Sequence, residues 1–492
     1  MNVTAALAEH ARTAPDRLAL IVEDETLTYA QLEDCVSRLA ASLAQEPAGG
    51  IALHLPNGLP LALLSLAAAR AGREAQILDP DWPAELTQRV LTGLRPARVF
   101  TASPDVMGDQ AVLIEPSASA QSLAGSLTPP RPGAVPETDP GTAFYVGFTS
   151  GSTGEPKGYR RSHRSWLESF KGDAIEFGLG PTDVVLAPGT LTHSLFLYAF
   201  MNGLHAGATV ILSRRFRPTQ VLHLITQYGA TVLYGVPTQL TLVIEAAEEG
   251  QQELLSSLRW ILSSGAKWFS EALPRLKAFA PNARFAEFYG ASELSFVTVA
   301  KDSESVPVTS VGRAFPGVTI TIRDEAGHVR PVGQPGRVFV ESPLVFMNYA
   351  YGGTGGCWRV GSAVSVGDVG FLDADGFLHL VGRANRMIVS SGKNIYPEEI
   401  ERVFARHSGI AAVAVLSIPD TQRGERIVAM LALRDQTVTR SALIAHGRQA
   451  LPLFKVPRVY GVVTDWPLTR SGKTDLEALR EAWRQGSYKA LQ

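Results

Sequence analysis

Two patterns of apolar and polar residues alternate along the first part of the chain. Short apolar runs, such as residues 18–22 and 51–55, have the length of buried strands. Leu32, Val36 and Leu39 recur instead at the spacing of one helix face. Short strands that alternate with longer helices are typical of α/β folds. This region is therefore predicted to form an α/β domain with a largely parallel sheet.

The pattern changes twice in the second half of the chain. Between residues 311 and 382, short strands alternate with glycine-rich turns, which predicts a small β-rich subdomain. The final segment alternates strands and helices again and is long enough for a small domain. We therefore expect an α/β protein with a large N-terminal domain at 1–383, made of α/β subdomains and the β-rich subdomain. A small, mobile α+β C-terminal domain at 384–492 is expected to follow it.

Composition narrows the classes of protein. The chain has 492 residues, of which 45% are hydrophobic and 19% charged, as in a folded protein of more than one domain. A formal net charge of −2 gives no reason to expect binding to nucleic acid or a membrane surface. Two cysteines, Cys35 and Cys357, fit a reducing compartment. Without a secretory signal or a stretch of ~18 apolar residues, we expect a cytoplasmic protein that has no integral membrane segment.

A loop rich in glycine and hydroxyl groups follows the apolar run at 143–148. From Tyr145 to Gly158 it is Tyr-Val-Gly-Phe-Thr-Ser-Gly-Ser-Thr-Gly-Glu-Pro-Lys-Gly. It is not a Walker A loop, because Gly158 rather than Ser or Thr follows Lys157. A surface linker is the alternative, but such a linker does not need hydroxyls and a lysine directly after a buried strand. Hydroxyls, backbone N–H groups and a lysine suit a polyphosphate, which predicts phosphate contacts from Thr149, Ser150, Gly151, Ser152, Thr153, Gly154 and Lys157.

This loop resembles the phosphate loop of the adenylate-forming enzymes, the superfamily of acyl-CoA synthetases, peptide-synthetase adenylation domains and luciferases. Further segments that resemble the family follow in its order, so the resemblance covers essentially the whole chain. They are Tyr289-Gly290-Ala291-Ser292-Glu293, Gly367-Asp368, Gly382-Arg383 and Pro467-Leu468-Thr469-Arg470-Ser471-Gly472-Lys473. Ser292 stands where the family has Thr, which keeps the hydroxyl group.

The resemblance implies residues for ATP and Mg²⁺. Glu293 would bind Mg²⁺, a cation that prefers oxygen ligands, together with Thr149 of the loop. Lys473 would be the catalytic cation that neutralises charge between the carboxylate and the α-phosphate, and Glu293 and Ser292 complete the catalytic set. The other nucleotide contacts implied are Gly265, Ala266, Tyr289 and Gly290, with Asp368 and Arg383 at the ribose.

An acyl pocket is implied by residues on three other segments. His193 matches a family histidine that lines the pocket and gates access to it. Amino-acid-activating relatives place an Asp near this position, and residues 191–204 contain no acid, which disfavours a free α-amino substrate. The remaining pocket residues implied lie at strand ends, where open α/β sheets bind ligands, and are Tyr234, Gly235, Val236 and Ala291.

The C-terminal segment resembles the part of the family that moves between two half-reactions. Asn385 occupies the hinge position, where the family often has Asp or Lys. The turn with Ser391, Gly392 and Asn394 resembles the one that lines the pantetheine tunnel of CoA-using members. The resemblance implies that this domain rotates about the hinge, withdraws Lys473 and presents the turn to a thiol.

Two arginines after the loop have no counterpart in the resemblance. Residues 159–164 are predicted to open a helix that contains Arg160 and Arg161. Their guanidinium groups either contact phosphates or are solvated in a first helical turn, and the sequence leaves both roles open.

The resemblance implies an acid–thiol ligase. It would use ATP to convert a medium-sized aliphatic or aryl carboxylic acid, such as one of fatty acid metabolism, to an acyl-adenylate. Transfer to CoA would give a thioester, AMP and pyrophosphate, with Mg²⁺ as cofactor. The alternatives are a stand-alone adenylation enzyme that loads the phosphopantetheine of an acyl carrier protein, and a non-catalytic binding protein of the same fold. We expect a monomer or homodimer.

Overall fold

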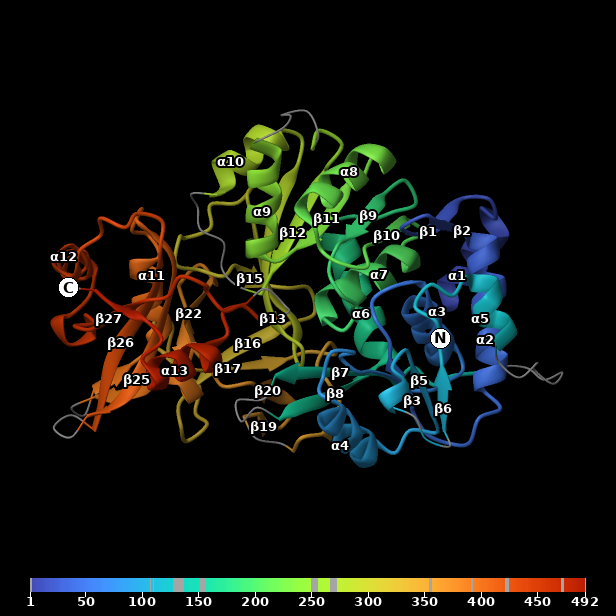
Figure 1. Ribbon diagram of the computed structural model, residues 1–492, viewed down its shortest axis with the longest axis horizontal. Coiled ribbons are helices and arrows are strands. Elements are labelled where there is room, and N and C mark those ends of the chain that lie inside the picture. Colours follow the sequence, from blue (N-terminus) through green and yellow to red (C-terminus); the bar gives the residue numbers. More distant parts are fainter. Residues whose placement is uncertain are drawn as a thin grey trace. The chain divides into compact units, whose positions relative to one another are not determined.

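The computed structural model describes residues 2–106, 108, 110–126, 137–150, 155–248, 255–265, 272–353, 356–390, 393–420, 424–469 and 473–491. Its contacts divide the chain into two compact units, which run from blue to yellow and from orange to red in Figure 1 apart from short exchanged segments. The first unit comprises Met1–Thr319 and Val340–Gly355, and the second comprises Ile320–Phe339 and Gly356–Gln492. Each unit has its own sheets and is described by itself.

The larger sheet of the first unit has the strand order β15-β14-β13-β12-β11-β9-β10-β1-β2. Its central strands, from β13 to β1, are parallel, and antiparallel strands extend both edges. The strands are β1 Leu18–Val22, β2 Glu25–Thr28, β9 Val184–Ala187, β10 Thr209–Leu212, β11 Val232–Gly235, β12 Trp260–Ser264, β13 Arg284–Ala291, β14 Ser295–Lys301 and β15 Arg313–Ala314.

A second sheet of the first unit has the order β18-β8-β7-β4-β3-β5-β6. Strands β7 to β6 are parallel, whereas β7–β8 and β8–β18 are antiparallel pairs. The strands are β3 Ile51–His54, β4 Ala75–Ile77, β5 Arg98–Thr101, β6 Ala111–Leu113, β7 Ala143–Ser150, β8 Pro156–Ser162 and β18 Tyr349–Tyr351. Two largely parallel sheets confirm the α/β fold class that the alternating pattern predicts.

Helices of the first unit form where the apolar spacing predicts them. In α2, the side chains of Leu32, Val36 and Leu39 are buried, and Thr28 forms a capping box with Gln31. The helices are α1 Ala5–Thr13, α2 Tyr29–Leu43, α3 Leu59–Arg70, α4 Ala84–Leu94, α5 Ala120–Ser126, α6 His163–Glu176, α7 Ser194–His205, α8 Pro218–Tyr228, α9 Pro237–Glu248 and α10 Ala272–Phe279.

The two faces of the larger sheet pack against different helices. Leu233 and its neighbours form a core with α8, α9 and α10. Side chains alternate between the faces of a strand, so Tyr234 lies on the opposite face from Leu233. That opposite face is where α7 packs, since Gly203 of α7 lies against Val185 and Val210. The sheet therefore directs Tyr234 toward the face that α7 covers.

The second unit contains two further sheets. The β-rich segment has the order β19-β20-β17-β21-β22, with β16 paired to β17. The C-terminal segment has the order β24-β23-β26-β27-β28, with β25 paired to β26. The strands are β16 Thr319–Arg323, β17 Gly336–Glu341, β19 Trp358–Val360, β20 Ala363–Ser365, β21 Asp368–Leu372, β22 Leu378–Arg383, β23 Ile388–Ser390, β24 Lys393–Ile395, β25 Ile410–Asp420, β26 Gly424–Leu433, β27 Tyr460–Val462 and β28 Lys489–Ala490.

Three helices complete the second unit, α11 Pro397–Phe404, α12 Arg440–Ala450 and α13 Leu476–Gln485. Pro397 stands in the first turn of α11, followed by Glu398 and Glu399, as the helix dipole favours. Small β-rich and α+β parts after a large α/β part match the expected fold class, whereas the boundary between 383 and 384 stays a prediction. Among the described residues, no helix combines the length and apolar character needed to span a bilayer.

Candidate functional site

The phosphate loop connects two antiparallel strands. Strand β7 ends at Ser150 and β8 begins at Pro156, and Thr149 is the register partner of Lys157. Both Thr149 and Lys157 are half-buried. The pairing therefore holds these two predicted phosphate ligands side by side where the loop begins and ends. The predicted contacts Gly151, Ser152, Thr153 and Gly154 lie outside the described residues, and the side chain of Ser150 is not described.

The two arginines do not open a helix. Strand β8 continues to Ser162, which caps α6, and the helix begins at His163. Arg160 pairs with Glu74, with 2.7 Å between Nε and Oε1. The expectation of a first helical turn fails because pairing with β7 and β18 keeps this segment extended.

Arg161 fills neither of the two roles that the sequence left open. Its side chain is buried and donates hydrogen bonds to the carbonyl oxygens of Ser292, at 3.0 Å, and Leu344, at 2.6 Å. Burial lowers the pKa of the guanidinium to about 10, so it is still charged at neutral pH. Arg161 therefore stabilises the backbone of the 289–293 motif through its hydrogen bond to Ser292.

The motif at 289–293 begins at the end of β13, and the carboxylate of its last residue is largely buried. Glu293 is 9% exposed, and its Oε1 accepts a hydrogen bond of 2.9 Å from the hydroxyl of Tyr349 on β18. The Phe346 amide donates to the Glu293 carbonyl oxygen at 2.7 Å. Gly290 is required here, because a Cβ would lie 2.1 Å from the Ser295 carbonyl oxygen. The carboxylate is thus fixed in direction by residues distant in sequence.

The arrangement suits a magnesium ion that arrives with a nucleotide. No group of three or more His, Cys, Asp or Glu side chains gathers to hold a metal within the described parts of the chain. Mg²⁺ in phosphate-transfer sites is held by one or two carboxylates and by substrate phosphates, rather than by a cage of protein ligands. Glu293 fits the role of the single carboxylate, and Thr149 stays a predicted second ligand.

The acyl-pocket residues approach the same motif. His193 caps the N-terminus of α7, since its Nδ1 accepts a hydrogen bond of 3.3 Å from the Leu195 amide. The next residue, Ser194, has its hydroxyl 3.4 Å from the Ser292 hydroxyl. Tyr234 and Val236 are buried at the end of β11. Ser194 therefore joins the predicted acid-binding helix to the predicted nucleotide motif.

Other predicted residues of the first unit lie at the carboxyl ends of β12 and β13. Gly265 follows β12 with a φ of +103°, and Tyr289, Gly290 and Ala291 end β13. Ala266 lies outside the described residues. The described ends agree with the rule that ligands bind at the carboxyl edge of such sheets.

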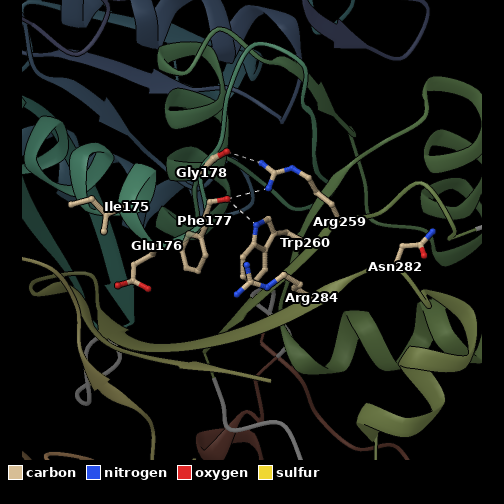
Figure 2. A pocket seen from close by; sticks show the side chains of 8 residues that line it. All are labelled: Ile175, Glu176, Phe177, Gly178, Arg259, Trp260, Asn282 and Arg284. Atoms are coloured by element: carbon tan, nitrogen blue, oxygen red, sulfur yellow. Dashed lines mark hydrogen bonds between the residues drawn. The ribbon is translucent and has the colours of Figure 1, made fainter. Parts of the chain in front are cut away.

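The pocket in Figure 2 is at the opposite edge of this sheet. It is lined by residues around the amino ends of β12 and β13 and the end of α6, namely Ile175, Glu176, Phe177, Gly178, Arg259, Trp260, Asn282 and Arg284. Arg259 is held there by an ion pair with Asp183. This pocket is therefore separate from the candidate site.

Asn57 is a supporting residue that sequence reasoning missed. It follows β3, and its Nδ2 donates to the carbonyl oxygens of Gly189, at 3.3 Å, and Ser213, at 2.6 Å. Its Oδ1 accepts from the Leu191 amide at 2.9 Å. The buried side chain thus holds the loop that leads to His193. An asparagine after a strand is too common a pattern to reveal such long-range contacts.

The second unit brings together the two predicted ribose contacts. Asp368 and Arg383 are register partners on β21 and β22, and Arg383 Nε donates to Asp368 Oδ1 at 3.0 Å. The Asp368 side chain is 6% exposed and that of Arg383 is 55% exposed. Gly367 has a φ of +88°, and a Cβ there would lie 2.8 Å from the ring of Trp358. The turn therefore requires glycine beside the aspartate.

The remaining predicted residues of the second unit are described only in part. Asn385 lies in a short 3-10 helix, Ala384–Arg386, and Asn394 lies in β24, but neither side chain is described. Ser391 and Gly392 lie outside the described residues. Lys473 is exposed, and its carbonyl oxygen accepts a hydrogen bond of 2.6 Å from the Thr469 amide.

Comparisons with known proteins agree with the family resemblance. The AMP-binding enzyme family matches residues 7–350, and the AMP-binding enzyme C-terminal domain matches residues 399–473. The chain is 37% identical to an uncharacterized acyl-CoA ligase, YhfT, of Bacillus subtilis, over 96% of each chain. It is 26% identical to VraA of Staphylococcus aureus, a putative long chain fatty acid-CoA ligase, over 98% of each chain.

A solved structure gives the same result for the fold. ATP-bound MatB from Rhodopseudomonas palustris has a TM-score of 0.87 and 25% identity, over 98% of this chain and 99% of that one. The chain therefore belongs to the AMP-binding enzyme family and is an AMP-forming acid–thiol ligase.

Proposed function

We propose that this protein activates a medium-sized aliphatic or aryl carboxylic acid with ATP and transfers the acyl group to CoA. The observation that carries the proposal is the contact of 3.4 Å between Ser194 and Ser292. It joins the helix capped by His193, the predicted acid gate, to the motif that ends in Glu293. An acid bound beside His193 would then be next to the phosphates of ATP.

The chemistry proceeds in two steps. A carboxylate oxygen attacks the α-phosphorus of ATP, the bond to the β-phosphate oxygen breaks, and pyrophosphate leaves. The thiolate of CoA then attacks the acyl carbon, and AMP leaves with the oxygen that came from the carboxylate. Positioning and charge stabilisation supply most of the catalysis, because the protein forms no covalent bond to either substrate.

Five of the predicted residues have a proposed role in these steps. Lys157, with the hydroxyl of Thr149, would hold the departing pyrophosphate, and Lys473 would neutralise charge at the reacting carboxylate. Asp368 would accept hydrogen bonds from the ribose hydroxyls. Mg²⁺, when bound at Glu293, supplies charge neutralisation for the phosphates. Tyr349 and Arg161 touch no reacting atom in this account and act by fixing Glu293 and the motif backbone.

The relatives support CoA as the acceptor. The names of YhfT and VraA are those of CoA ligases, which supports CoA over a carrier protein. Withdrawal of Lys473 by rotation about Asn385 would let the turn at Ser391, Gly392 and Asn394 guide the pantetheine thiol to the adenylate. Rotation and the role of this turn are part of the proposal.

Pyrophosphate exchange tests the proposal. The full-length protein is supplied with ATP, labelled pyrophosphate and a panel of aliphatic and aryl acids, with and without CoA. We expect acid-dependent exchange with a few members of the panel and AMP release that requires CoA. Acid-dependent exchange without AMP release when CoA is added would indicate a carrier-protein acceptor and contradict the CoA step. Absence of exchange with every acid would contradict the activation step.

A further inference from the structure

Four polar side chains are buried together inside the first unit. Asp173 of α6, Tyr198 and Asn202 of α7, and Tyr234 of β11 are each at most 5% exposed. Aromatic rings surround them, since Tyr198 lies 5.4 Å from Phe170 and 5.1 Å from Phe296 between ring centroids. A polar group in such an apolar setting is unfavourable unless its hydrogen bonds are made. The catalytic steps described above use none of these four side chains.

The hydrogen bonds of this cluster are incomplete. The Tyr234 hydroxyl donates to Asp173 Oδ2 at 3.4 Å. Asp173 Oδ1, the Tyr198 hydroxyl and Asn202 Nδ2 are buried and make no hydrogen bond of normal geometry. Tyr198 and Asn202 nevertheless lie near enough to the carboxyl to stabilise its ionised form. The amide and the hydroxyl thus lie within hydrogen-bonding reach of the carboxyl, but in poor geometry, so each group can take a better placed partner.

These unsatisfied atoms define the chemistry of a partner. An oxygen that both donates and accepts would donate to Asp173 Oδ1 and accept from Asn202 Nδ2. Hydroxyl groups and water have this property, whereas an ether or a methyl group does not. Burial raises the pKa of Asp173 to about 7, which favours an uncharged partner over an ammonium ion.

The cluster lies on the same elements as the predicted acyl pocket. Tyr234 directly precedes Gly235 and Val236, and Tyr198 and Asn202 stand on the helix that His193 caps. The Trp260 indole donates to the Phe177 carbonyl oxygen at 2.8 Å (Figure 2). This hydrogen bond fixes the end of α6 and therefore the position of Asp173. An acid that enters past His193 and extends along α7 would bring the end of its tail toward these atoms.

We propose that Asp173, Tyr198, Asn202 and Tyr234 form a polar subsite at the inner end of the acyl pocket, which selects acids whose tail carries a hydroxyl group. The inference rests on the proposed function and adds a substrate class to it. A buried water molecule offers the same chemistry, so the test separates an oxygen supplied by the acid from one supplied by water.

The experiment compares pairs of acids that share a carbon skeleton and differ by one hydroxyl at the far end. Pyrophosphate exchange gives kcat/KM for each member of a pair with the full-length protein. A site built to hydrogen-bond a hydroxyl discriminates strongly against the analogue that lacks it, so we expect a preference of at least about tenfold for one hydroxylated acid. In the variants Asp173→Asn and Asn202→Leu, the ratio of kcat/KM for the hydroxylated acid to that for the acid without the hydroxyl should fall toward one. Exchange with the acid that lacks the hydroxyl should continue.

Two further variants provide a milder substitution in the cluster and a control outside it. Tyr198→Phe removes a single oxygen and should lower the preference even if a larger substitution prevents folding. Thr87→Val removes another buried hydroxyl without a partner, on α4, and should leave the preference unchanged. Exchange with unsubstituted acids but no preference for any hydroxylated partner overturns the subsite and leaves the proposed function standing. The subsite is likewise overturned if the variants alter only the melting temperature, since water would then be the partner.

Discussion

At the scale of single residues, the direction of the Glu293 carboxylate depends on one hydroxyl group. Tyr349 donates to Glu293 Oε1 at 2.9 Å from a strand 56 residues further along the chain. Hydrogen bonds to charged groups contribute about 1.5–3 kcal/mol each. Loss of this bond leaves the carboxylate in place but free to rotate, which weakens its hold on a metal ion that arrives with ATP.

Tyr349→Phe is therefore expected to raise the Mg²⁺ concentration needed for half-maximal pyrophosphate exchange, by about tenfold or more. The maximal rate at saturating Mg²⁺ should change less, because Glu293 itself is retained. Tyr351→Phe, on the same strand, removes a hydroxyl that has no contact with Glu293 and serves as the control. Superimposable Mg²⁺ titrations for the wild type and Tyr349→Phe would show that this hydrogen bond does not position a metal ligand.

The buried carboxyl of Asp173 gives a pH prediction. Burial raises its pKa from 3.8 to about 7, so between these values the folded protein keeps a proton that the unfolded chain has released. The free energy of unfolding therefore falls as the pH rises through this interval. The charged and titratable groups that face it are Tyr198 on α7, Tyr234 on β11 and Arg259 beside β12, and burial keeps both tyrosine pKa values well above this range.

Asp173→Asn removes this titration, so its free energy of unfolding should decline less than that of the wild type between pH 4 and 7. Chemical denaturation at several pH values measures the difference between the two profiles, in which the titration of all other groups cancels. Parallel profiles for the two proteins would mean that the Asp173 carboxyl titrates in its ordinary range.

The residues proposed to bind substrate carry a clearer sequence signal than those that support them. Glu293 and Asp368 stand in short local motifs, so a role could be proposed for each from the sequence alone. Tyr349, Asn57 and Asp173 act through partners far away in the chain, and no local pattern marks them. Their roles became visible only once the fold had brought those partners together.

At the scale of elements, Asn57 ties two strand ends together. It holds the loop between β9 and α7 through Gly189 and Leu191, and the end of β10 through Ser213. This loop ends at His193, the N-cap of α7 and the proposed acid gate, so its position would set where the acid enters. The proposed contacts to ATP are made by other segments, which separates the expected effects on the two substrates.

Asn57→Asp keeps the acceptor for the Leu191 amide but loses the donor to two carbonyl oxygens. We expect KM for the acid to rise by about tenfold and KM for ATP to change by less than about twofold, because the loop that carries His193 loosens. Steady-state kinetics with each substrate varied in turn measures this split. Asn282→Asp removes an amide that donates to the Ser256 carbonyl oxygen, away from the candidate site, and provides the control. Equal increases in both KM values would assign Asn57 a general structural role.

Local propensity predicted most elements of the first unit but placed the start of α6 too early. The segment Tyr159 to Ser162 was expected to be helical, yet it is the end of β8. Strand pairing on both sides overrides the local preference, and the buried Arg161 finds its partners in carbonyl groups of other segments. By contrast, the amphipathic spacing and the capping residues of α2 both indicate the same helix. The sequence therefore predicts this helix closely.

At the scale of the whole molecule, the proposed mechanism uses the C-terminal segment differently in the two half-reactions. Lys473→Ala should lower acid-dependent pyrophosphate exchange by about a hundredfold or more, because a cation at the reacting carboxylate is removed. Thioester formation from supplied acyl-adenylate should change far less. Lys489→Ala removes an exposed lysine of β28 and controls for charge. Equal losses in both half-reactions would contradict the role assigned to Lys473.

The pattern of apolar residues predicted the kinds of parts and their order. Strands that alternate with helices predicted the large α/β part, and short strands between glycine-rich turns predicted the β-rich part after it. Rotation about Asn385 would move the C-terminal domain between two positions. The pattern of residues predicts folded elements and does not show such a movement. The hinge therefore stays a prediction, as do the contacts of Ser391 and Gly392.

An isotope experiment tests whether the acid is activated as an acyl-adenylate. The acid is labelled with ¹⁸O in its carboxylate, and the products formed with ATP and CoA are analysed by mass spectrometry. If an acyl-adenylate forms and CoA displaces AMP, one labelled oxygen passes into the phosphate of AMP. We predict labelled AMP together with acyl-CoA. Unlabelled AMP, or label in inorganic phosphate instead, would contradict activation by adenylation.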